Sequence, residues 1–154
     1  MAGVNKKFSF WMWLLIPVIL GSCTGDKKIY TSDCDNSVTF KPVTYAHLID
    51  SLRYYDKKYI EISGGKYREG KEQSALFNDS LYMPAPSTAL WVNFSQDCPL
   101  YLSGTRVGFF EYSNGGYTSI NNKKVRIRGR LDLHNHGYLK QYKGCIDRVS
   151  FIEL

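Results

Sequence analysis

Alternating apolar and polar positions mark a series of short strands along the chain. In DKKYIEISGGKYR, Ile60 and Ile62 alternate with polar neighbours, and the paired glycines Gly64 and Gly65 then predict a bulge or a sharp bend. Four further segments have the composition of short strands: QSALF, ALWVNF, KKVRIRGRL and GCIDRVSFIEL. The apolar residues of the last segment fall at both odd and even positions, so they cannot all lie on one face of a regular strand. We therefore expect a bulge or burial on both faces there. The pattern predicts a mainly β fold.

One helical pattern precedes these strands. Tyr45, Leu48, Ile49 and Leu52 are spaced as one apolar face of about two helical turns. Thr44 lies immediately before them and is a suitable N-cap. We therefore expect one short N-terminal helix ahead of the first strand.

The first residues carry a different, purely apolar pattern. Two lysines precede an almost unbroken apolar run from Phe8 to Leu20, which is shorter than the about 20 residues that a membrane span needs. The run has the size of a signal-peptide core, and Leu20-Gly21-Ser22-Cys23 resembles a bacterial lipobox. The alternative is an ordinary signal anchor followed by a chance cysteine.

The lipobox resemblance implies that residues 1–22 are removed as a signal peptide and that Cys23 carries the lipid. Acyl chains anchor a protein to a membrane without spanning it. Thr24 stands where an aspartate would favour retention in the inner membrane, so we expect attachment to the bacterial outer membrane. The polar, aperiodic residues 23–41 are expected to form a flexible tether, and residues 42–154 the domain.

Composition supports the β prediction and narrows the partners. The 12 Tyr, 8 Phe and 3 Trp favour strands. The full chain has 20 Lys and Arg against 14 Asp and Glu, a net charge of +6, and without residues 1–22 the net charge is +4 because two lysines leave. This balance is mildly basic, so we expect no nucleic-acid partner.

Three cysteines remain beside the predicted lipidated one. Their odd number leaves at least one outside any intramolecular disulfide, and three pairings are possible. No two cysteines have the close spacing of a zinc site. Cys34 and Cys98 lie in polar, loop-like sequence (TSDCDN and SQDCPL), and Cys145 begins an apolar strand. We therefore predict a Cys34–Cys98 disulfide and an unpaired Cys145.

Two strand openings resemble each other and also a known fold. DKKYIEISG and NKKVRIRG each have a turn residue, two lysines, alternating apolar residues and a glycine. They resemble the first and fourth strands of the oligonucleotide/oligosaccharide-binding (OB) fold, a five-stranded Greek-key barrel. More narrowly, Lys58–Tyr67, Ser74–Phe94 and Asn135–Leu154 are similar to motifs of small bacterial OB-like lipoproteins of unassigned function. The residues Gln96–Ile120 depart from this pattern as a long insert, where many OB barrels carry a helix.

The strand KKVRIRGRL is the most basic segment of the predicted domain. Its alternation sends one set of side chains outward, namely Lys124, Arg126, Arg128 and Arg130, and the other set inward. Outward cations on a strand are most often a solvated face that discourages edge-to-edge aggregation. An anionic glycan or lipid headgroup is the alternative partner for this face.

The segment after this strand contains a potential metal site. Asp132, His134 and His136 would share one face if the strand continued, and such a set can suit a transition metal. Asn135 and Gly137 instead indicate a turn, so we expect loop residues that satisfy their own backbone and no metal.

Candidate ligand-binding residues are aromatic or basic. Trp91, Tyr112 and Tyr117 could stack on sugars while Arg126 and Arg128 meet acidic groups, and Tyr101, Phe109 and Phe110 belong to the same aromatic insert. The alternative is plain packing beneath a long loop.

The sequence contains no recognisable catalytic constellation, so we expect a non-enzyme without a cofactor. The predicted function is an exported, lipid-anchored binding or interaction module of the cell envelope, whose partner is an envelope protein or an anionic glycan. The first alternative is a structural accessory subunit of a larger envelope complex. The second is a small metal-dependent hydrolase, which would need a pocket that joins His134 or His136 to a carboxylate.

Overall fold

The computed structural model describes residues 27–71, 73–79, 85–113 and 115–154. The strands are β1 (Ile29–Thr31), β2 (Lys41–Thr44), β3 (Tyr59–Gly70), β4 (Gln73–Asn78), β5 (Leu90–Val92), β6 (Tyr101–Leu102), β7 (Lys124–Asp132) and β8 (Cys145–Glu153). The helices are α1 (Tyr45–Asp50) and α2 (Leu52–Tyr55), with 3-10 turns at Pro86–Thr88 and Tyr138–Lys140. The predicted signal peptide and Cys23 lie outside the described residues.

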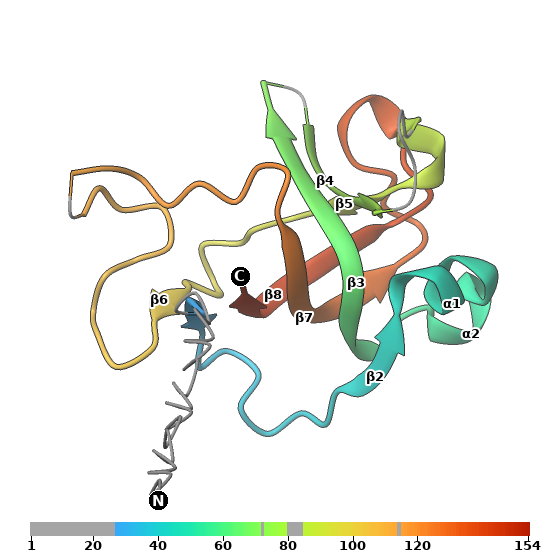
Figure 1. Ribbon diagram of the computed structural model, residues 1–154. Coiled ribbons are helices and arrows are strands. Elements are labelled where there is room, and N and C mark those ends of the chain that lie inside the picture. The colour runs from blue at the N-terminus through green and yellow to red at the C-terminus, as the bar shows by residue number, and fades with distance from the viewer. Residues whose placement is uncertain (1–26, 72, 80–84, 114) are drawn as a thin grey trace, which may run out of the picture.

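Five of the strands close into a β-barrel (Figure 1). β3 pairs with β4 on one side and with β7 on the other, β4 pairs with β5, and β7 pairs with β8. The barrel closes through β5 and β8, which run parallel. Around the barrel the strands therefore follow the order β3, β4, β5, β8, β7. Numbered one to five along the chain, this is the order 1-2-3-5-4 of the OB fold. The predicted OB-like barrel is confirmed.

The barrel interior is filled by the residues that the alternation assigned to it. Val125, Ile127 and Leu131 of β7 are at most 5% exposed, and Ile60 and Ile62 of β3 are fully buried beside them. The outward and inward sets of β7 are therefore as predicted. Each such side chain contributes roughly 1.5–3 kcal/mol by leaving water.

Glycines permit the barrel strands to bend at two places. The pairing of β3 with β7 shifts register between Ile62 and Gly65, where the sequence predicted a bulge. Gly64 adopts φ +74°, a backbone conformation that residues with a side chain rarely adopt. A Cβ on Gly65 would lie 2.7 Å from the Leu76 side chain, which is too close for a residue larger than glycine. In the last strand pair, a Cβ on Gly129 would lie 2.7 Å from the Asp147 carbonyl oxygen, next to a second register shift. The irregularity expected in the last strand is thus also present.

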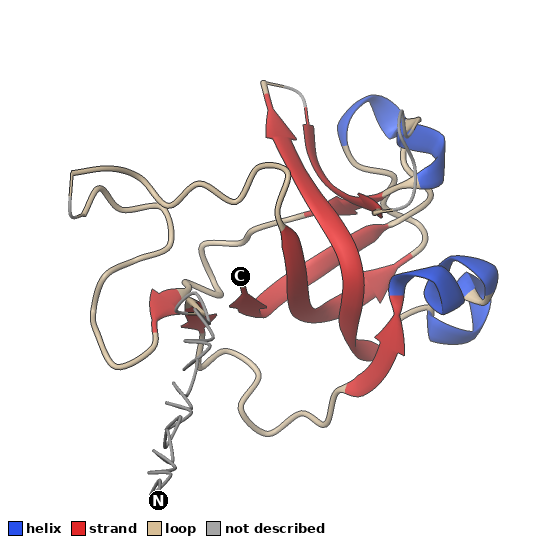
Figure 2. Cartoon of the chain, in the orientation of Figure 1, coloured by secondary structure: helices blue, strands red, loops and turns tan. Residues whose placement is uncertain are grey.

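The predicted helix is present but is divided in two. Thr44 caps α1, because its hydroxyl accepts a hydrogen bond from the His47 amide. Tyr45 and Leu48 are buried, and the Tyr45 hydroxyl donates to the Leu76 carbonyl at 2.8 Å. This bond ties α1 to β4. Figure 2 shows both helices together at one side of the barrel.

The expectation of a flexible tether over residues 23–41 is wrong from Ile29 onward. β1 pairs with β8 and with β6, so it extends the sheet. Tyr30 is 2% exposed, its ring lies 4.9 Å from that of Phe109, and its hydroxyl lies 2.7 Å from that of Thr118. Asp35 is buried and forms an ion pair with Arg148 at 2.8 Å. These contacts make the segment part of the domain.

The cysteines pair as predicted. Cys34 and Cys98 form a disulfide that joins the segment after β1 to the long insert. Cys145 is unpaired and buried at the start of β8. Burial raises the pKa of its thiol to about 12, so it is held in the unreactive neutral form.

Candidate functional site

The outward face of β7 is not a row of unpaired cations. Arg128 Nε donates to Glu61 Oε2 of β3 at 2.6 Å, and Arg126 pairs with Glu153 of β8. The Arg128 guanidinium also lies 4.4 Å from the ring centre of Phe151. Two guanidinium groups and two carboxylates therefore neutralise one another across three strands.

The Glu153 carboxylate is shared with a third cation. Lys27 Nζ lies 3.1 Å from Glu153 Oε1. The Lys27 hydrogen bond, followed by that of Arg126, lowers the pKa of Glu153, so its charge persists. With these partners in place, Arg126 and Arg128 have little positive charge left to offer an anionic ligand, and the candidate site lies elsewhere.

The loop after β7 places three potential metal ligands together. One ligand atom each from Asp56, Asp132 and His134 lies within 4.8 Å of the others. Lys57 Nζ already lies 2.5 Å from Asp132 Oδ1, and this bond lowers the pKa of Asp132 to about 2. A cation would have to displace the Lys57 ammonium group, so the arrangement is explained without a metal.

The turn predicted in this loop is confirmed. β7 ends at Asp132, whose carboxylate accepts a hydrogen bond from the His134 amide at 2.8 Å. Asn135 Oδ1 accepts from the Gly137 amide at 3.0 Å, and Gly137 adopts φ +62°. The polar residues thus satisfy their own backbone, as expected. His136 instead contacts the Tyr142 carbonyl oxygen through Nδ1, at 2.8 Å.

The predicted aromatic binding residues occupy two separate environments. Trp91 is half-buried and packs against Tyr142, with 5.2 Å between the ring centres. Tyr112 and Tyr117 contact each other at 5.3 Å on the insert and are 63% and 71% exposed. No contact joins Trp91 to this tyrosine pair or to the paired arginines in the part of the chain that the structure describes. The five predicted residues therefore do not form one site.

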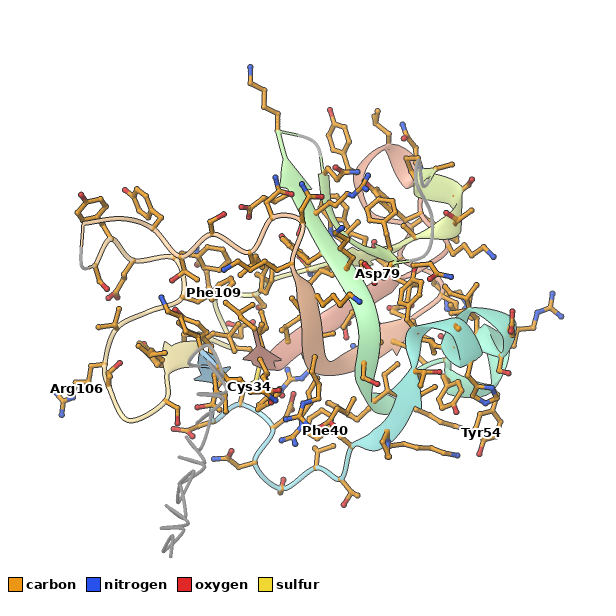
Figure 3. All side chains as sticks on the ribbon, viewed as in Figure 1. Cys34, Phe40, Tyr54, Asp79, Arg106 and Phe109 are labelled. Carbon is orange, nitrogen blue, oxygen red and sulfur yellow. A yellow bond between two sulfur atoms is a disulfide. The ribbon has the colours of Figure 1, made fainter. Side chains whose placement is uncertain are left out.

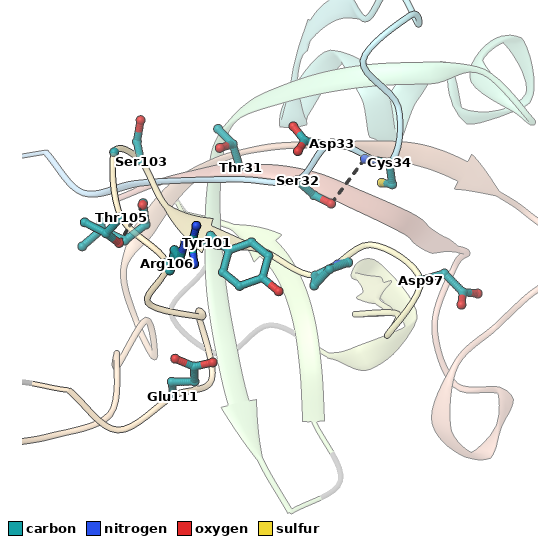
Figure 4. Close-up of a pocket in the computed structure, with 13 residues that line it drawn as sticks. Thr31, Ser32, Asp33, Cys34, Asp97, Tyr101, Ser103, Thr105, Arg106 and Glu111 are labelled. Atoms are coloured by element: carbon teal, nitrogen blue, oxygen red, sulfur yellow. Dashed lines mark hydrogen bonds between the residues drawn. The ribbon is translucent and has the colours of Figure 1, made fainter.

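The insert forms a hollow against the N-terminal segment, close to the disulfide (Figure 4). It consists of two adjoining cavities, which we call the insert hollow. The polar cavity has a volume of about 880 Å³ and lies between residues 31–34 and residues 97–111. The apolar cavity has a volume of about 470 Å³ and lies between residues 94–101 and 108–111. Ligand sites in proteins typically have volumes of about 300–1,000 Å³.

Three phenylalanine rings form the wall of the apolar cavity. The rings contact one another, since the ring centre of Phe94 lies 5.6 Å from that of Phe109 and 5.2 Å from that of Phe110, and those two lie 4.8 Å apart. Phe109 is 3% exposed and belongs to the barrel core, which fixes its position. Phe110 is 64% exposed although its neighbour is buried. The predicted alternative of plain packing therefore holds for Phe109 and not for Phe110.

Pro99, Tyr101 and Glu111 line both cavities. Tyr101 lies on β6, which is held by β1, and is 42% exposed. Glu111 Oε2 accepts a hydrogen bond from the Gly108 amide at 3.0 Å, which fixes the carboxylate over the turn. An aromatic ring and an oriented carboxylate thus stand where the two cavities meet.

The polar cavity is acidic. Asp33, Asp97, Glu111 and Arg106 line it, and none of these four forms an ion pair within the described ranges. Figure 3 shows Arg106 projecting outward from the end of the loop, on the side of the molecule that carries Cys34 and Phe109. Three carboxylates and one guanidinium give this cavity a net negative charge in a basic protein.

Sequence reasoning identified the insert but missed the acidic residues of the hollow. Asp33 and Asp97 each precede a cysteine of the predicted disulfide, in SDC and QDC. Because a disulfide brings its two cysteines together, the pairing also places these two aspartates on the same side of the domain. The predicted disulfide was therefore the signal that could have located them.

No protein-family model, no curated protein and no solved structure matches this chain. Among the residues that the structure describes, no helix is both long and apolar enough to cross a membrane.

Proposed function

We propose that this protein is an exported, lipid-anchored binding module of the bacterial envelope and that the insert hollow is its ligand site. The observation that carries the binding role is the continuity of the two cavities through Tyr101 and Glu111. A ligand there would contact an apolar wall and polar groups at once, which is the usual composition of a binding site. The proposal assigns no reaction to the protein.

The anchor is supported by the lipobox resemblance, and the early start of the fold determines how far from the anchor the domain would lie. Only six positions separate Cys23 from Ile29, the first residue of β1. A fully extended chain of that length reaches about 20 Å. The insert hollow, which begins at Thr31, would then lie close to the membrane surface.

Metabolic labelling tests the anchor. Cells that express the full chain and grow with an alkyne analogue of palmitate should label the wild type and not Cys23→Ala. Cys145→Ala is the matched control, because it removes a buried thiol and should leave the label in place. Equal labelling of the wild type and Cys23→Ala would refute the anchor.

Ligand-observed NMR tests the site. The full chain, purified in a nonionic detergent, is titrated with a panel of neutral, cationic and anionic phenyl compounds. We expect at least one to bind and to lose its binding in Phe110→Ser, which removes the exposed ring of the hollow. Tyr54→Ser is the control, because Tyr54 is 55% exposed on the opposite side of the barrel (Figure 3). Binding that is unchanged in Phe110→Ser, or absent throughout the panel, would refute the site.

A further inference from the structure

We infer that the ligand of the insert hollow is an organic cation, namely an ammonium group attached to an apolar or aromatic body. The inference rests on the proposed function, because it specifies the chemistry of the ligand at the same site. Its evidence is the charge of the polar cavity, the exposed rings beside it and the spacing of its carboxylates.

The carboxylates of the hollow stand out from the other acidic groups of the domain. Half of the described acidic side chains form ion pairs with a lysine or an arginine, for example Asp35 with Arg148 and Asp147 with Arg130. The side chains without such a pair are Asp33, Asp50, Asp56, Glu69, Asp97 and Glu111, as far as the described ranges extend. Three of these six line the polar cavity, where Arg106 is the one cation among the lining residues. The cavity thus carries a net negative charge in a basic protein, which favours a cationic ligand.

Aromatic rings stand next to this charge. Tyr101 and Phe110 are 42% and 64% exposed, and both line the apolar cavity together with Glu111. The face of an aromatic ring attracts ammonium groups, and rings combined with carboxylates are the usual means of binding them. The apolar body of the ligand would occupy the space beside Phe94 and Phe109.

The spacing of the carboxylates favours an organic cation over a metal ion. A metal ion needs several ligand atoms around one point. None of Asp33, Asp97 and Glu111 belongs to a group of potential ligands that converge in this way among the described residues. Carboxylates spread along a cavity suit a larger cation, whose charge is distributed and whose body fills the space between them.

Three probes that differ mainly in charge test the inference: 2-phenylethylammonium, 2-phenylethanol and 3-phenylpropionate. Affinities are measured by ligand-observed NMR on the full chain in nonionic detergent, with protein-free micelles subtracted. We expect the cation to bind about fivefold more tightly than the alcohol and the anion to bind most weakly. Added salt should reduce the preference for the cation, because the carboxylates are exposed to solvent.

Variants then assign the preference to the hollow. Glu111→Gln should reduce the affinity for the cation about three- to fivefold and leave the affinity for the alcohol unchanged. Asp50→Asn is the matched control, since it removes an exposed carboxylate without an ion pair on α1 and should change neither affinity.

The outcomes separate the inference from the proposed function. Equal affinities for all three probes, or a preference for the anion, would refute the inference that the ligand is a cation. The proposed site would still be supported if the binding of these probes were lost in Phe110→Ser. The inference would also be refuted if Asp50→Asn reduced the preference for the cation as much as Glu111→Gln does. The cation would then be attracted by the charge of the whole protein and not by the hollow. If no probe bound, the site itself would be refuted, and the inference with it.

Discussion

Tyr30 attaches the N-terminal strand to the barrel, and its truncation should destabilise the whole domain. The side chain is 2% exposed, packs edge-on against Phe109 at 4.9 Å and shares a hydrogen bond with Thr118. Replacing a buried aromatic residue by alanine removes apolar burial and leaves a cavity, so Tyr30→Ala should cost roughly 3–5 kcal/mol of unfolding free energy. Tyr30→Phe keeps the ring and removes one hydrogen bond, and it should cost about 1 kcal/mol.

Urea unfolding followed by tryptophan fluorescence measures both changes. The Cys34–Cys98 disulfide is kept oxidised, because it holds the segment near the insert whether or not β1 is paired. Tyr112→Ala is the control, since Tyr112 is 63% exposed and its loss should change stability by less than about 0.5 kcal/mol. If Tyr30→Ala were no more destabilised than this control, residues 29–31 would be a tether after all, and the pairing of β1 with β8 would be refuted.

Three further predictions concern the cysteines and one ion pair. Replacing Cys34 and Cys98 together by serine removes a cross-link between residues 64 positions apart and should cost about 4 kcal/mol, measured by urea unfolding; a cost below about 1 kcal/mol would contradict the pairing. Because burial raises the pKa of the Cys145 thiol to about 12, iodoacetamide at neutral pH should leave it unmodified in the folded protein and alkylate it in urea, as mass spectrometry would show. The Lys57 hydrogen bond lowers the pKa of Asp132 from 3.8 to about 2, so this group stabilises the fold above its unfolded pKa and loses that contribution as the pH falls toward 2. Since Lys57 is half-exposed, Asp132→Asn should remove on the order of 1 kcal/mol of this acid-dependent stability. The measurement is the unfolding free energy of the wild type and of Asp132→Asn against pH, and identical curves for the two proteins would contradict the prediction.

The barrel strands could be predicted because their signal is local. In β7, alternate residues are apolar over nine positions, and this repetition alone separates the face of Val125 and Ile127 from that of Arg126 and Arg128. The bulge at Gly64 was predictable for a similar reason, because glycine tolerates the positive φ that the bend requires. The order of the strands came from the resemblance to the OB fold and not from periodicity.

The N-terminal strand could not be predicted because its stabilising partners are distant in sequence. β1 has only three residues, too few to show an alternation. Its neighbours are Phe151 and Ile152 on β8 and Leu102 on β6, and the Asp35–Arg148 pair spans more than a hundred positions. A polar segment of this kind has the composition of a linker, and only tertiary contacts make it a strand.

The arginines of β7 show a related limit of sequence reasoning. Alternation correctly placed Arg126 and Arg128 on the outside, but it does not state which residues stand beside them. In the folded sheet, Arg128 is opposite Glu61 and Arg126 is opposite Glu153, so each cation meets a carboxylate on a neighbouring strand. Cross-strand pairs of opposite charge stabilise a sheet. These arginines therefore have structural partners, whereas the acidic residues of the insert hollow have no ion-pair partner among the described residues.

The insert itself is held to the barrel by a few contacts that leave its most aromatic part exposed. The disulfide at Cys98 and the buried Phe109 fix its first half, and the buried Ile120 fixes its end. Between Phe109 and Ile120, three large aromatic side chains are more than 60% exposed, namely Phe110, Tyr112 and Tyr117. Exposed aromatic residues do not stabilise the fold by burial, and a loop that is anchored at both ends needs none of them for its attachment. Of the three, Phe110 lines the insert hollow beside Glu111, and there the proposed ligand would account for its exposure.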